Sequence, residues 1–268
     1  MITSSHNPKV KRAIQLRNAR RRKKSGLIII DGLREIRRAM AGGVTLVEAL
    51  VSGGELSDAA AALARELASQ TEVWEVAPAL HARIAFGARD EGIVAIARRP
   101  AADIAQWQPP EHCLTVIVEA AEKPGNLGAV VRTADGAGAN AVIAANALCD
   151  PFHPNAIRAS LGLVFCLPIF TLSSEAAIAW LKRHEFAILA AVLQASIDYR
   201  SADYSGRVAI ALGSEASGLS STWRTDEITP IRLPMRGWGD SLNLSAAAAA
   251  LLYHAAGVRE GDGARSGQ

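Results

Sequence analysis

Three loops of this sequence place glycines beside polar or charged side chains, an arrangement that lets a backbone approach a bound ligand closely. In the first loop, residues 123–135, Asn126 stands at a loop-to-helix junction and Arg132 follows nearly two turns into the helix. Taken alone, these two residues also fit an ordinary strand-to-helix junction with an Asn cap and a surface Arg. The chemistry of the first loop therefore depends on what the other two loops supply.

The second and third loops add a carboxylate and a group of short polar side chains. Residues 212–219 place Glu215 among small residues directly after an apolar run. A carboxylate at the end of a strand could orient a cation or bind a hydroxyl group, although a capped turn would have the same composition. Residues 233–245 include Ser241, Asn243 and Ser245 at the start of an alanine-rich segment, which a helix cap would also explain.

Alternating apolar runs and helical segments predict the elements that hold these loops. In the second half of the chain we expect strands at residues 114–118, 141–145, 167–171, 187–193, 208–212 and 229–233. We expect helices at residues 126–136, 154–161, 174–184 and 243–256. This alternation predicts an α/β fold with a mostly parallel sheet and helices on both faces. Ligands bind beyond the carboxyl ends of the strands in such sheets, so the loops that follow strands are the candidates for a binding site.

The first part of the chain forms a separate small α/β unit by the same criteria. One helix is expected over residues 8–24, with Asn7 as its cap and Gly26 as its end. The remaining elements are helices at 32–41, 58–69 and 78–86 and strands at 27–30, 44–52, 73–76 and 93–97. A proline-rich stretch without a period follows. We therefore predict an N-terminal domain at 1–98, a linker at 99–112, a second domain at 113–258 and a flexible tail at 259–268.

The charge of the chain is divided unevenly. The formal net charge is only +3, yet residues 1–40 carry 12 Lys and Arg against 2 acids, and the other 228 residues have a net charge of −7. Clustered cations repel one another unless phosphates neutralise them, so the N-terminal segment indicates a nucleic-acid contact. An organelle transit peptide and a solvated helix face have similar compositions and are the alternatives.

Several functional classes lack their sequence signatures here. No apolar run approaches the ~18–20 residues of a membrane helix. The three cysteines lie far apart without a CxxC pair, which argues against a disulfide scaffold and fits a reducing compartment. The sequence has no GxxxxGK[ST] loop, no HExxH and no paired His/Cys cluster, so we expect neither a P-loop nor a metal. The glycine pattern at 136–141 matches a dinucleotide fingerprint, but it precedes a strand instead of following one.

Taken together, the three loops resemble the motifs of the SpoU-type (TrmH-like) RNA ribose 2′-O-methyltransferases of the SPOUT superfamily. The family's N-x-G-x-x-x-R-T-A-D pattern is met by Asn126, Gly128, Arg132, Thr133, Ala134 and Asp135. Its G-S-E-G-x-G-L pattern is met by Gly213, Ser214, Glu215, Gly218 and Leu219, with Ala216 in place of a glycine. Its I-P-M-x-G-x-x-x-S-L-N-V-S pattern is met by Pro234, Met235, Gly237, Ser241, Leu242, Asn243 and Ser245. The resemblance covers about residues 111–258.

Two further segments look similar to parts of this family. Residues 155–168 resemble the segment that links the family's first two motifs. Residues 2–11 and the signature Asp31-Gly32-x-Arg34 resemble the substrate-binding domain that many members carry, which is related to a ribosomal protein fold. Asp31 stands where that signature usually has Glu. The second similarity makes a transit peptide the weaker alternative.

The resemblance implies methyl transfer from S-adenosylmethionine to a ribose 2′-OH, a trefoil knot in the C-terminal domain, and a homodimer. It implies a catalytic cluster of Arg132, Asn126, Glu215, Ser241 and Asn243. It also implies cofactor contacts, largely through backbone groups and apolar packing, from Gly213, Leu233, Leu242, Leu193, Met235 and Ser214. Because a guanidinium stays protonated in proteins, we expect Arg132 to bind the target phosphate and to stabilise the developing alkoxide.

The partner that the resemblance implies is RNA rather than DNA, since the 2′-OH is the acceptor. Phosphate contacts are expected from Lys9, Lys11, Arg12, Arg20, Arg21, Arg22, Lys23, Lys24 and Arg158. We expect 23S rRNA as the substrate of a cytoplasmic enzyme with no metal and no membrane partner. The alternatives are the same chemistry on tRNA and a non-catalytic RNA-binding assembly factor on the same fold. A nucleotide-dependent oxidoreductase is a third interpretation, which the misplaced glycines disfavour.

Overall fold

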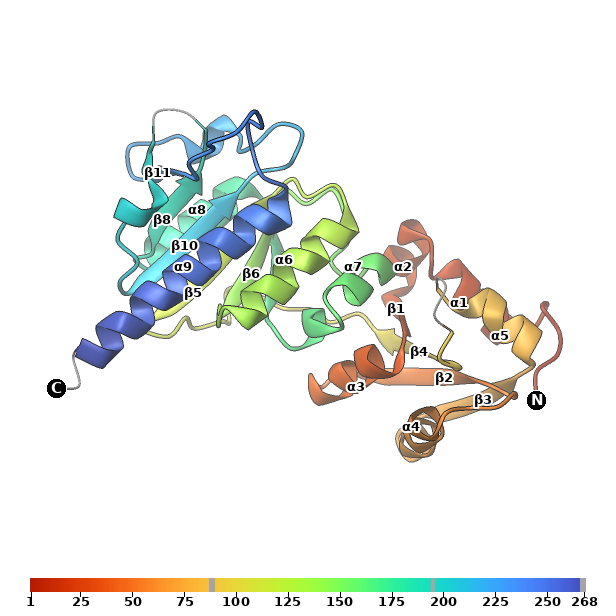
Figure 1. The fold of residues 1–268 in the computed structure, drawn as a ribbon. Coiled ribbons are helices and arrows are strands. Elements are labelled where there is room, and N and C mark those ends of the chain that lie inside the picture. The colour runs from red at the N-terminus through yellow and green to blue at the C-terminus, as the bar shows by residue number, and fades with distance from the viewer. Residues whose placement is uncertain (87–89, 194–195, 266–268) are drawn as a thin grey trace. The chain divides into compact units, whose positions relative to one another are not determined.

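The protein, seen here as a computed structural model, contains two compact units (Figure 1). The structure describes residues 1–86, 90–193 and 196–265. The first unit comprises Met1–Ala101 together with Phe152–Cys166, and the second comprises Ala102–Pro151 together with Leu167–Gln268. The predicted domain boundaries at residues 98 and 113 stay a prediction, but they do not anticipate that Phe152–Cys166 packs with the N-terminal unit.

A four-stranded mixed sheet forms the centre of the first unit. Its strands are β1 (Leu27–Asp31), β2 (Leu46–Ser52), β3 (Glu72–Val76) and β4 (Ile93–Arg98), in the order β1-β4-β2-β3. Strand β4 runs antiparallel to both β1 and β2, whereas β2 and β3 are parallel. The apolar runs that predicted these strands supply the buried core, in which Val10, Leu50 and Ile96 pack together.

The helices of the first unit follow the predicted pattern with one correction. They are α1 (Pro8–Gln15), α2 (Ala19–Ser25), α3 (Leu33–Ala41), α4 (Asp58–Ala68), α5 (Pro78–Ile84) and, from the later segment, α7 (Pro154–Ala159) with the short turn η1 (Leu163–Phe165). The single helix expected over residues 8–24 is wrong. Asn18 interrupts it, because its side chain accepts hydrogen bonds from the backbone of Arg20 (2.9 Å) and Arg21 (3.4 Å) and caps a second helix.

Residues 152–166 are fixed to the first unit by close backbone contacts. The Arg38 guanidinium donates a hydrogen bond to the carbonyl oxygen of Leu161 at 2.8 Å. Gly162 has a positive φ of 85°, and a Cβ there would lie 2.9 Å from Glu35 Cα, so only glycine allows this approach. The segment that resembles the family's link between motifs therefore belongs structurally to the N-terminal unit.

A seven-stranded parallel sheet forms the second unit. Its strands are β5 (Cys113–Glu119), β6 (Ala141–Ala145), β7 (Ile169–Leu172), β8 (Ala187–Ala191), β9 (Ile197–Asp198), β10 (Arg207–Leu212) and β11 (Thr229–Arg232). Their order is β7-β6-β5-β10-β8-β11-β9, and every paired neighbour is parallel. The prediction of a mostly parallel sheet is confirmed, although the sequence did not indicate β9.

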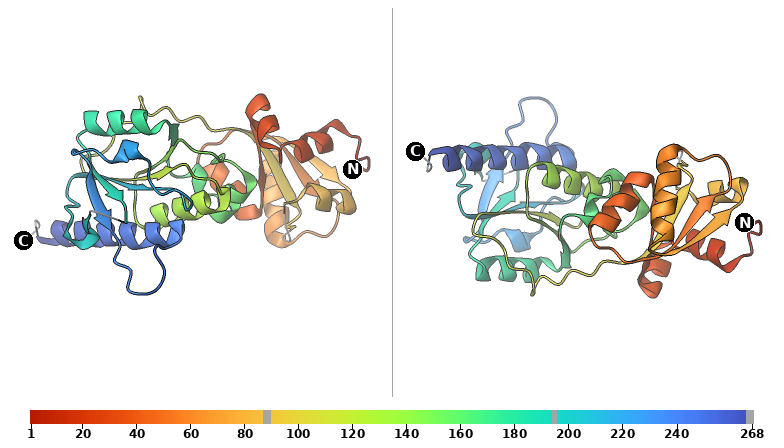
Figure 2. Two further views of the ribbon diagram at one scale, coloured as in Figure 1. Left: turned by 90° about the horizontal axis from the view of Figure 1, so that it is seen from above. Right: turned by 90° about the horizontal axis from the view of Figure 1, so that it is seen from below.

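Helices cover both faces of this sheet, as predicted (Figure 2). They are α6 (Pro124–Gly136), α8 (Ser174–Arg183) and α9 (Leu244–Arg265), with short turns η2 (Tyr199–Ser201) and η3 (Ser221–Trp223). Helices α6 and α9 pack against each other on one face, and α8 lies on the other. The predicted end of the last helix near residue 256 is wrong. Arg259 donates a hydrogen bond to the carbonyl oxygen of Cys113 at 3.3 Å and holds the helix to the sheet beyond Gly257.

Candidate active site

The three loops meet around the carboxylate of Glu215. The side-chain amides of Asn126 and Asn243 both donate to Glu215 Oε1, each at 2.7 Å. Lys123 Nζ lies 3.4 Å from the other oxygen, Oε2. One carboxylate thus joins the loop after β5, the loop after β10 and the start of α9. Sequence reasoning did not single out Lys123, although it lies inside the first loop.

Local backbone structure fixes the orientation of both amides. Helix α6 begins at Pro124, with Lys123 at its cap, so the expectation that Asn126 caps this helix is wrong. Asn126 lies in the first turn, and its side chain is free to reach Glu215. Asn243 Oδ1 accepts hydrogen bonds from Ser245 N (2.9 Å) and Ser245 Oγ (2.7 Å). Because its oxygen is occupied at the start of α9, the amide nitrogen of Asn243 faces the carboxylate.

The structure does not connect Arg132 to this cluster. Arg132 is exposed on α6, and its side chain makes no hydrogen bond or ion pair within the described part of the chain. Ser241 is also exposed, but it lies on the wall of the adjoining cavity. Of the five predicted catalytic residues, the structure therefore brings three into direct contact, places Ser241 at the cavity and leaves Arg132 available to a ligand.

A cavity of about 940 Å³ opens beside the cluster, within the second unit. Its size lies at the upper end of the range typical of small-molecule sites. All six predicted cofactor residues are on its wall: Leu193, Gly213, Ser214, Leu233, Met235 and Leu242. Their role as cofactor contacts stays a prediction. The wall combines aliphatic side chains with the backbone of two loops, which suits a flat heteroaromatic group whose edges need hydrogen bonds.

The loop after β10 closes tightly on itself and forms one side of this cavity. A Cβ on Gly213 would lie 2.0 Å from the carbonyl carbon of Gly218, so only glycine allows this closure. The backbone N–H of Gly218 donates to the Ser214 carbonyl at 2.9 Å, and Gly218 has a positive φ of 65°. Ala216, which departs from the family motif, has no positive φ, so its side chain is accommodated without backbone strain.

Two of the predicted RNA contacts are ion-paired within the first unit. Lys9 Nζ lies 3.3 Å from Glu48 Oε2 and 3.6 Å from Glu72 Oε2, and it stands over the Trp74 ring. Arg12 lies 3.1 Å from Glu48 Oε1. Glu48 is buried, and a buried carboxylate needs such partners. Lys9 and Arg12 therefore stabilise the unit itself, and an RNA phosphate would compete with Glu48 for them.

The prediction that Arg22 contacts RNA is wrong. Its side chain is 0 % exposed, and its guanidinium donates to the carbonyl oxygens of Leu16 and Arg17, each at 2.9 Å. Arg22 satisfies carbonyl groups where α1 ends and α2 begins. The sequence shows a run of cations without showing which one points inward. Its neighbours Arg20, Arg21, Lys23 and Lys24 are exposed, as is Lys11 on α1.

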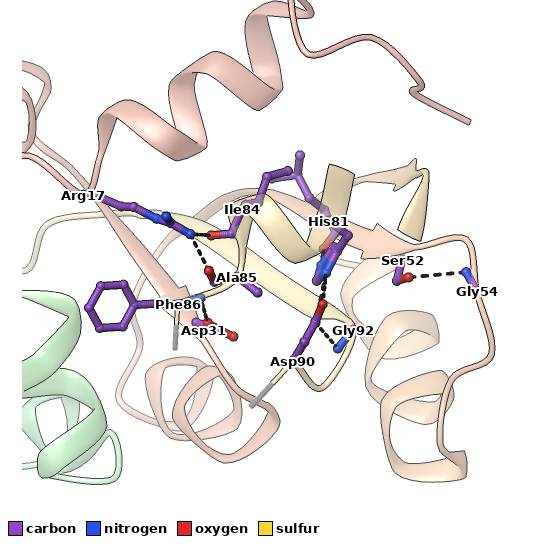
Figure 3. A network of polar contacts seen from close by, with 11 residues as sticks. Arg17, Asp31, Ser52, Gly54, His81, Ile84, Ala85, Phe86, Asp90 and Gly92 are labelled. Atoms are coloured by element: carbon purple, nitrogen blue, oxygen red, sulfur yellow. Dashed lines mark hydrogen bonds and ion pairs between the residues drawn. The ribbon is translucent and has the colours of Figure 1, made fainter. Parts of the chain in front are cut away.

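Arg158 is also engaged within the first unit. It is half-buried, and its guanidinium donates to the carbonyl oxygen of Phe86. Close by, Arg17 donates to the carbonyl oxygens of Ile84 and Ala85 at the end of α5 (Figure 3). The backbone N–H of Phe86 in turn donates to Asp31. Burial raises the pKa of Asp31 to about 6, against the hydrogen bond from Phe86 and the charge of Arg158, which both lower it.

A second polar pair lies beside this group in the first unit. His81 is fully buried, with Nδ1 3.0 Å from Asp90 Oδ1 and Nε2 3.3 Å from the Leu50 carbonyl oxygen (Figure 3).

In the described part of the chain, no group of three or more His, Cys, Asp and Glu side chains is arranged to hold a metal ion. Within the same residues, no helix is both long and apolar enough to span a bilayer.

These features define an α/β protein with a cavity of small-molecule size at the carboxyl edge of a parallel sheet. Comparison with known families places it more narrowly. Residues 113–253 match the SpoU rRNA Methylase family, and residues 7–95 match an MRM3-like substrate binding domain. The chain belongs to the SpoU rRNA methylase family, as the loop motifs predicted.

Two relatives resemble the chain over most of its length. It is 30% identical over 250 residues to the 23S rRNA (uridine(2479)-2′-O)-methyltransferase of Streptomyces viridochromogenes, covering 90% of this chain and 86% of that protein. It is 24% identical to the 23S rRNA (guanosine(2553)-2′-O)-methyltransferase of Bacillus subtilis, covering 96% and 99%.

Solved structures give the same assignment. A crystal structure of an RNA 2′-O ribose methyltransferase matches with a TM-score of 0.84 and 36% identity, covering 96% of this chain and 98% of that one. The SpoU methyltransferase AviRb from Streptomyces viridochromogenes, in complex with AdoMet, matches with a TM-score of 0.87 and 29% identity, covering 95% and 98%. The similarity therefore extends through both units of the chain.

Proposed function

We propose that this protein transfers the methyl group of S-adenosylmethionine to a ribose 2′-OH of 23S rRNA. The observation that carries the proposal is the Asn126–Glu215–Asn243 cluster, built from the three family motifs at the edge of a cavity large enough for the cofactor. Two relatives that match most of the chain are named as 2′-O-methyltransferases of 23S rRNA, which supports the substrate class.

The cavity residues suit the cofactor that the neighbouring structure holds. Leu193, Leu233 and Leu242 offer apolar surface for the adenine ring, and the loops at Gly213 and Met235 offer backbone groups for its edge. S-adenosylmethionine supplies a methyl group that the positive sulfur already activates, so no metal is required. The role of the chain is to hold the cofactor and to bring the acceptor oxygen into line with the methyl carbon.

The polar cluster orients the acceptor, and Arg132 binds it. Asn126, Asn243 and Ser241 hold the ribose, and Glu215 fixes the two amides. Arg132 binds the target phosphate and stabilises the negative charge that develops on the 2′-oxygen as its proton passes to solvent water, while the O–CH3 bond forms and the S–CH3 bond of the cofactor breaks. The exposure of Arg132 and its lack of a partner among the described residues support this role. A guanidinium in an ion pair would have to break that pair before it could bind the RNA phosphate.

The first unit provides the long-range attraction to RNA in this proposal. Lys11, Arg20, Arg21, Lys23 and Lys24 are exposed cations on α1 and α2, and the second unit lacks such a cluster in its sequence. The match of residues 7–95 to a substrate binding domain supports the same division of labour. Lys9, Arg12 and Arg158 contribute only if RNA displaces their present partners.

We also propose that the enzyme is a cytoplasmic homodimer with a trefoil knot in its C-terminal domain. Tyr253 and Val258 are exposed apolar residues on α9, with exposed fractions of 56% and 36%, which supports association through this helix. Sedimentation of the purified chain tests the dimer directly. A monomer at all accessible concentrations would contradict it.

Transfer of labelled methyl groups tests the proposed reaction. Purified protein is incubated with tritiated S-adenosylmethionine and, separately, with total rRNA and total tRNA. Incorporation into rRNA, with the site mapped by comparing 2′-O-methylation in cells with and without the gene, is the expected result. Incorporation into tRNA alone favours the alternative substrate. RNA binding without transfer would show a non-catalytic assembly factor.

A further inference from the structure

A buried carboxylate outside the family motifs lies beside the loop after β10, residues 213–219, which forms one side of the cavity. Glu119, the last residue of β5, is only 2 % exposed. A buried carboxylate is costly unless hydrogen-bond donors surround it. Glu119 receives three: Ser174 Oγ at 2.6 Å, Ser220 N at 2.7 Å and Ser220 Oγ at 2.8 Å. Burial raises the pKa of Glu119, but these donors outweigh it and hold the pKa below its usual value.

Two of these donors come from the residue that ends the cavity loop. Residues 213–219 all lie on the cavity wall, and Ser220 follows them directly. The beginning of the loop is fixed by β10, whose Leu212 pairs with Val118, the residue before Glu119. Glu119 therefore holds the far end of the loop next to its starting point. Glu215, which organises the polar cluster, lies between these two fixed ends.

The third donor fixes Glu119 from the opposite side. Ser174, the first residue of α8, accepts a hydrogen bond at 2.9 Å from the Asn146 amide, which follows β6. Asn146 has a positive φ of 46°, and its Oδ1 accepts from Ser174 N at 3.4 Å. Neither Asn146 nor Ser174 lies on the cavity wall. The carboxylate is thus attached to rigid elements on one side and to the loop on the other.

We infer that Glu119 is a positioning residue, which holds the loop after β10 at Ser220 and thereby sets both cofactor affinity and the position of Glu215. The inference rests on the proposed function in one respect, namely that the cavity binds S-adenosylmethionine. Glu119 touches neither the cofactor nor the reacting atoms. Its effect reaches them through the seven residues of the segment Gly213–Leu219.

Two serine substitutions separate this role from a general effect on stability. Ser220→Ala removes the hydroxyl group that donates a hydrogen bond to Glu119. Ser173→Ala removes the side chain that caps α8, in which Ser173 Oγ accepts a hydrogen bond from Ala176 N at 3.2 Å. Each variant loses one side-chain hydrogen bond, and only the first one loosens the loop. We expect Ser220→Ala to weaken S-adenosylmethionine binding about tenfold, the effect of one hydrogen bond to a charged group. Ser173→Ala is expected to lower Tm with an unchanged Kd.

Isothermal titration of the full chain with S-adenosylmethionine measures these constants, below the Tm of every variant. Glu119→Gln, which keeps the size of the side chain but loses its charge, is expected to raise Kd and to lower kcat. Glu119→Asp is expected to recover part of both. Equal loss of affinity in Ser220→Ala and Ser173→Ala, or wild-type affinity in Ser220→Ala, would overturn the inference. Failure of the unaltered chain to bind S-adenosylmethionine would instead refute the proposed function, and with it the premise of this inference.

Discussion

At the scale of single residues, the charged groups of the site differ in whether they already have a partner within the protein. Glu215 is held by two amides and a lysine, whereas Arg132 has no partner among the described residues. A carboxylate that already has its donors orients neighbouring groups well. A guanidinium that faces solvent can bind an incoming phosphate without first breaking an ion pair. The two residues therefore have different expected phenotypes.

Arg132→Ala is expected to slow methyl transfer strongly and to leave cofactor binding intact. Loss of one donor to a developing negative charge lowers kcat about 10²- to 10³-fold. The Kd for S-adenosylmethionine should change by less than about twofold, because Arg132 is not on the cavity wall. Tritium transfer and isothermal titration measure the two quantities. Arg132→Lys keeps the positive charge but loses the planar set of guanidinium donors, so it should retain part of kcat. Near-normal turnover of the alanine variant would exclude the assigned role.

Residue types alone predicted which polar groups gather, but not how each is used. Asn126 was expected to cap a helix, yet its amide donates to Glu215 because α6 begins two residues earlier. Arg22 was expected at the surface, yet it is buried and bonds to backbone carbonyls. Within a run of five cations, the orientation of one side chain depends on where α2 begins, and Asn18 fixes that start from outside the run.

At the scale of elements, the parallel strands were the most predictable part of the fold. Buried strands need continuous apolar runs, so β5, β6 and β10 lie within a residue or two of their predicted positions. Helix ends were less predictable, because tertiary contacts such as that of Arg259 with Cys113 set them. The position of Phe152–Cys166 in the first unit was not predictable, since it depends on contacts between distant parts of the chain.

The closed loop after β10 predicts a steric effect at Gly213. In Gly213→Ala the new methyl group would lie 2.0 Å from the Gly218 carbonyl carbon, so the loop has to shift. Overpacking of this kind costs about 1–3 kcal/mol, and we expect cofactor affinity to fall at least tenfold as the wall moves. Gly257→Ala is the control, because a Cβ there meets nothing within 4 Å. If titration gives equal affinities for the two variants, the closed loop does not shape the cofactor site.

The end of β1 predicts a pH-dependent contribution to stability. The pKa of Asp31 is about 6 in the folded state and near 3.8 when unperturbed, so the folded protein binds this proton more tightly. The contribution of this bound proton to the stability of the folded protein is complete below pH 3.8 and is lost as the pH rises through about 6. Asp31→Asn mimics the protonated form, since its oxygen can still accept from Phe86. We expect the free energy of unfolding of this variant to exceed that of the parent by about 1 kcal/mol above pH 7, a value reduced because solvent partly screens Asp31.

Chemical denaturation at pH values from 4 to 8 tests this expectation for Asp31. Other groups near Asp31, namely Arg158, Asp90 and His81, are present in both proteins, so the difference between the two curves isolates Asp31. The curves should meet near pH 4 and separate as the pH rises. Parallel curves would mean that folding does not shift the pKa of Asp31, and a variant that becomes less stable than the parent as the pH rises would mean that folding stabilises the carboxylate.

At the scale of the whole molecule, the uneven charge of the sequence has a structural counterpart. The net charge of +10 in residues 1–40 includes cations that are already used inside the protein, namely Lys9, Arg12, Arg17 and Arg22. Deleting this region would remove the elements on which Phe152–Cys166 packs, so a truncated protein is an unsuitable test of RNA binding. Substitution of the exposed cations avoids this problem.

A variant with Lys11, Arg20, Arg21, Lys23 and Lys24 changed to Gln is expected to fold and to bind S-adenosylmethionine normally, since these side chains are exposed. Its affinity for rRNA should fall. The slope of log Kd against log salt should decrease by roughly 0.7–0.9 for each phosphate that the variant no longer neutralises. The control changes Lys182, Arg183 and Arg200, three exposed cations of the second unit that do not line the cavity, to Gln, so that the change in slope can be compared per charge removed. Filter binding at several salt concentrations measures both slopes. An unchanged slope in the first variant, or equal decreases per charge in the two, would show that attraction to RNA is a property of the overall charge and not of the N-terminal helices.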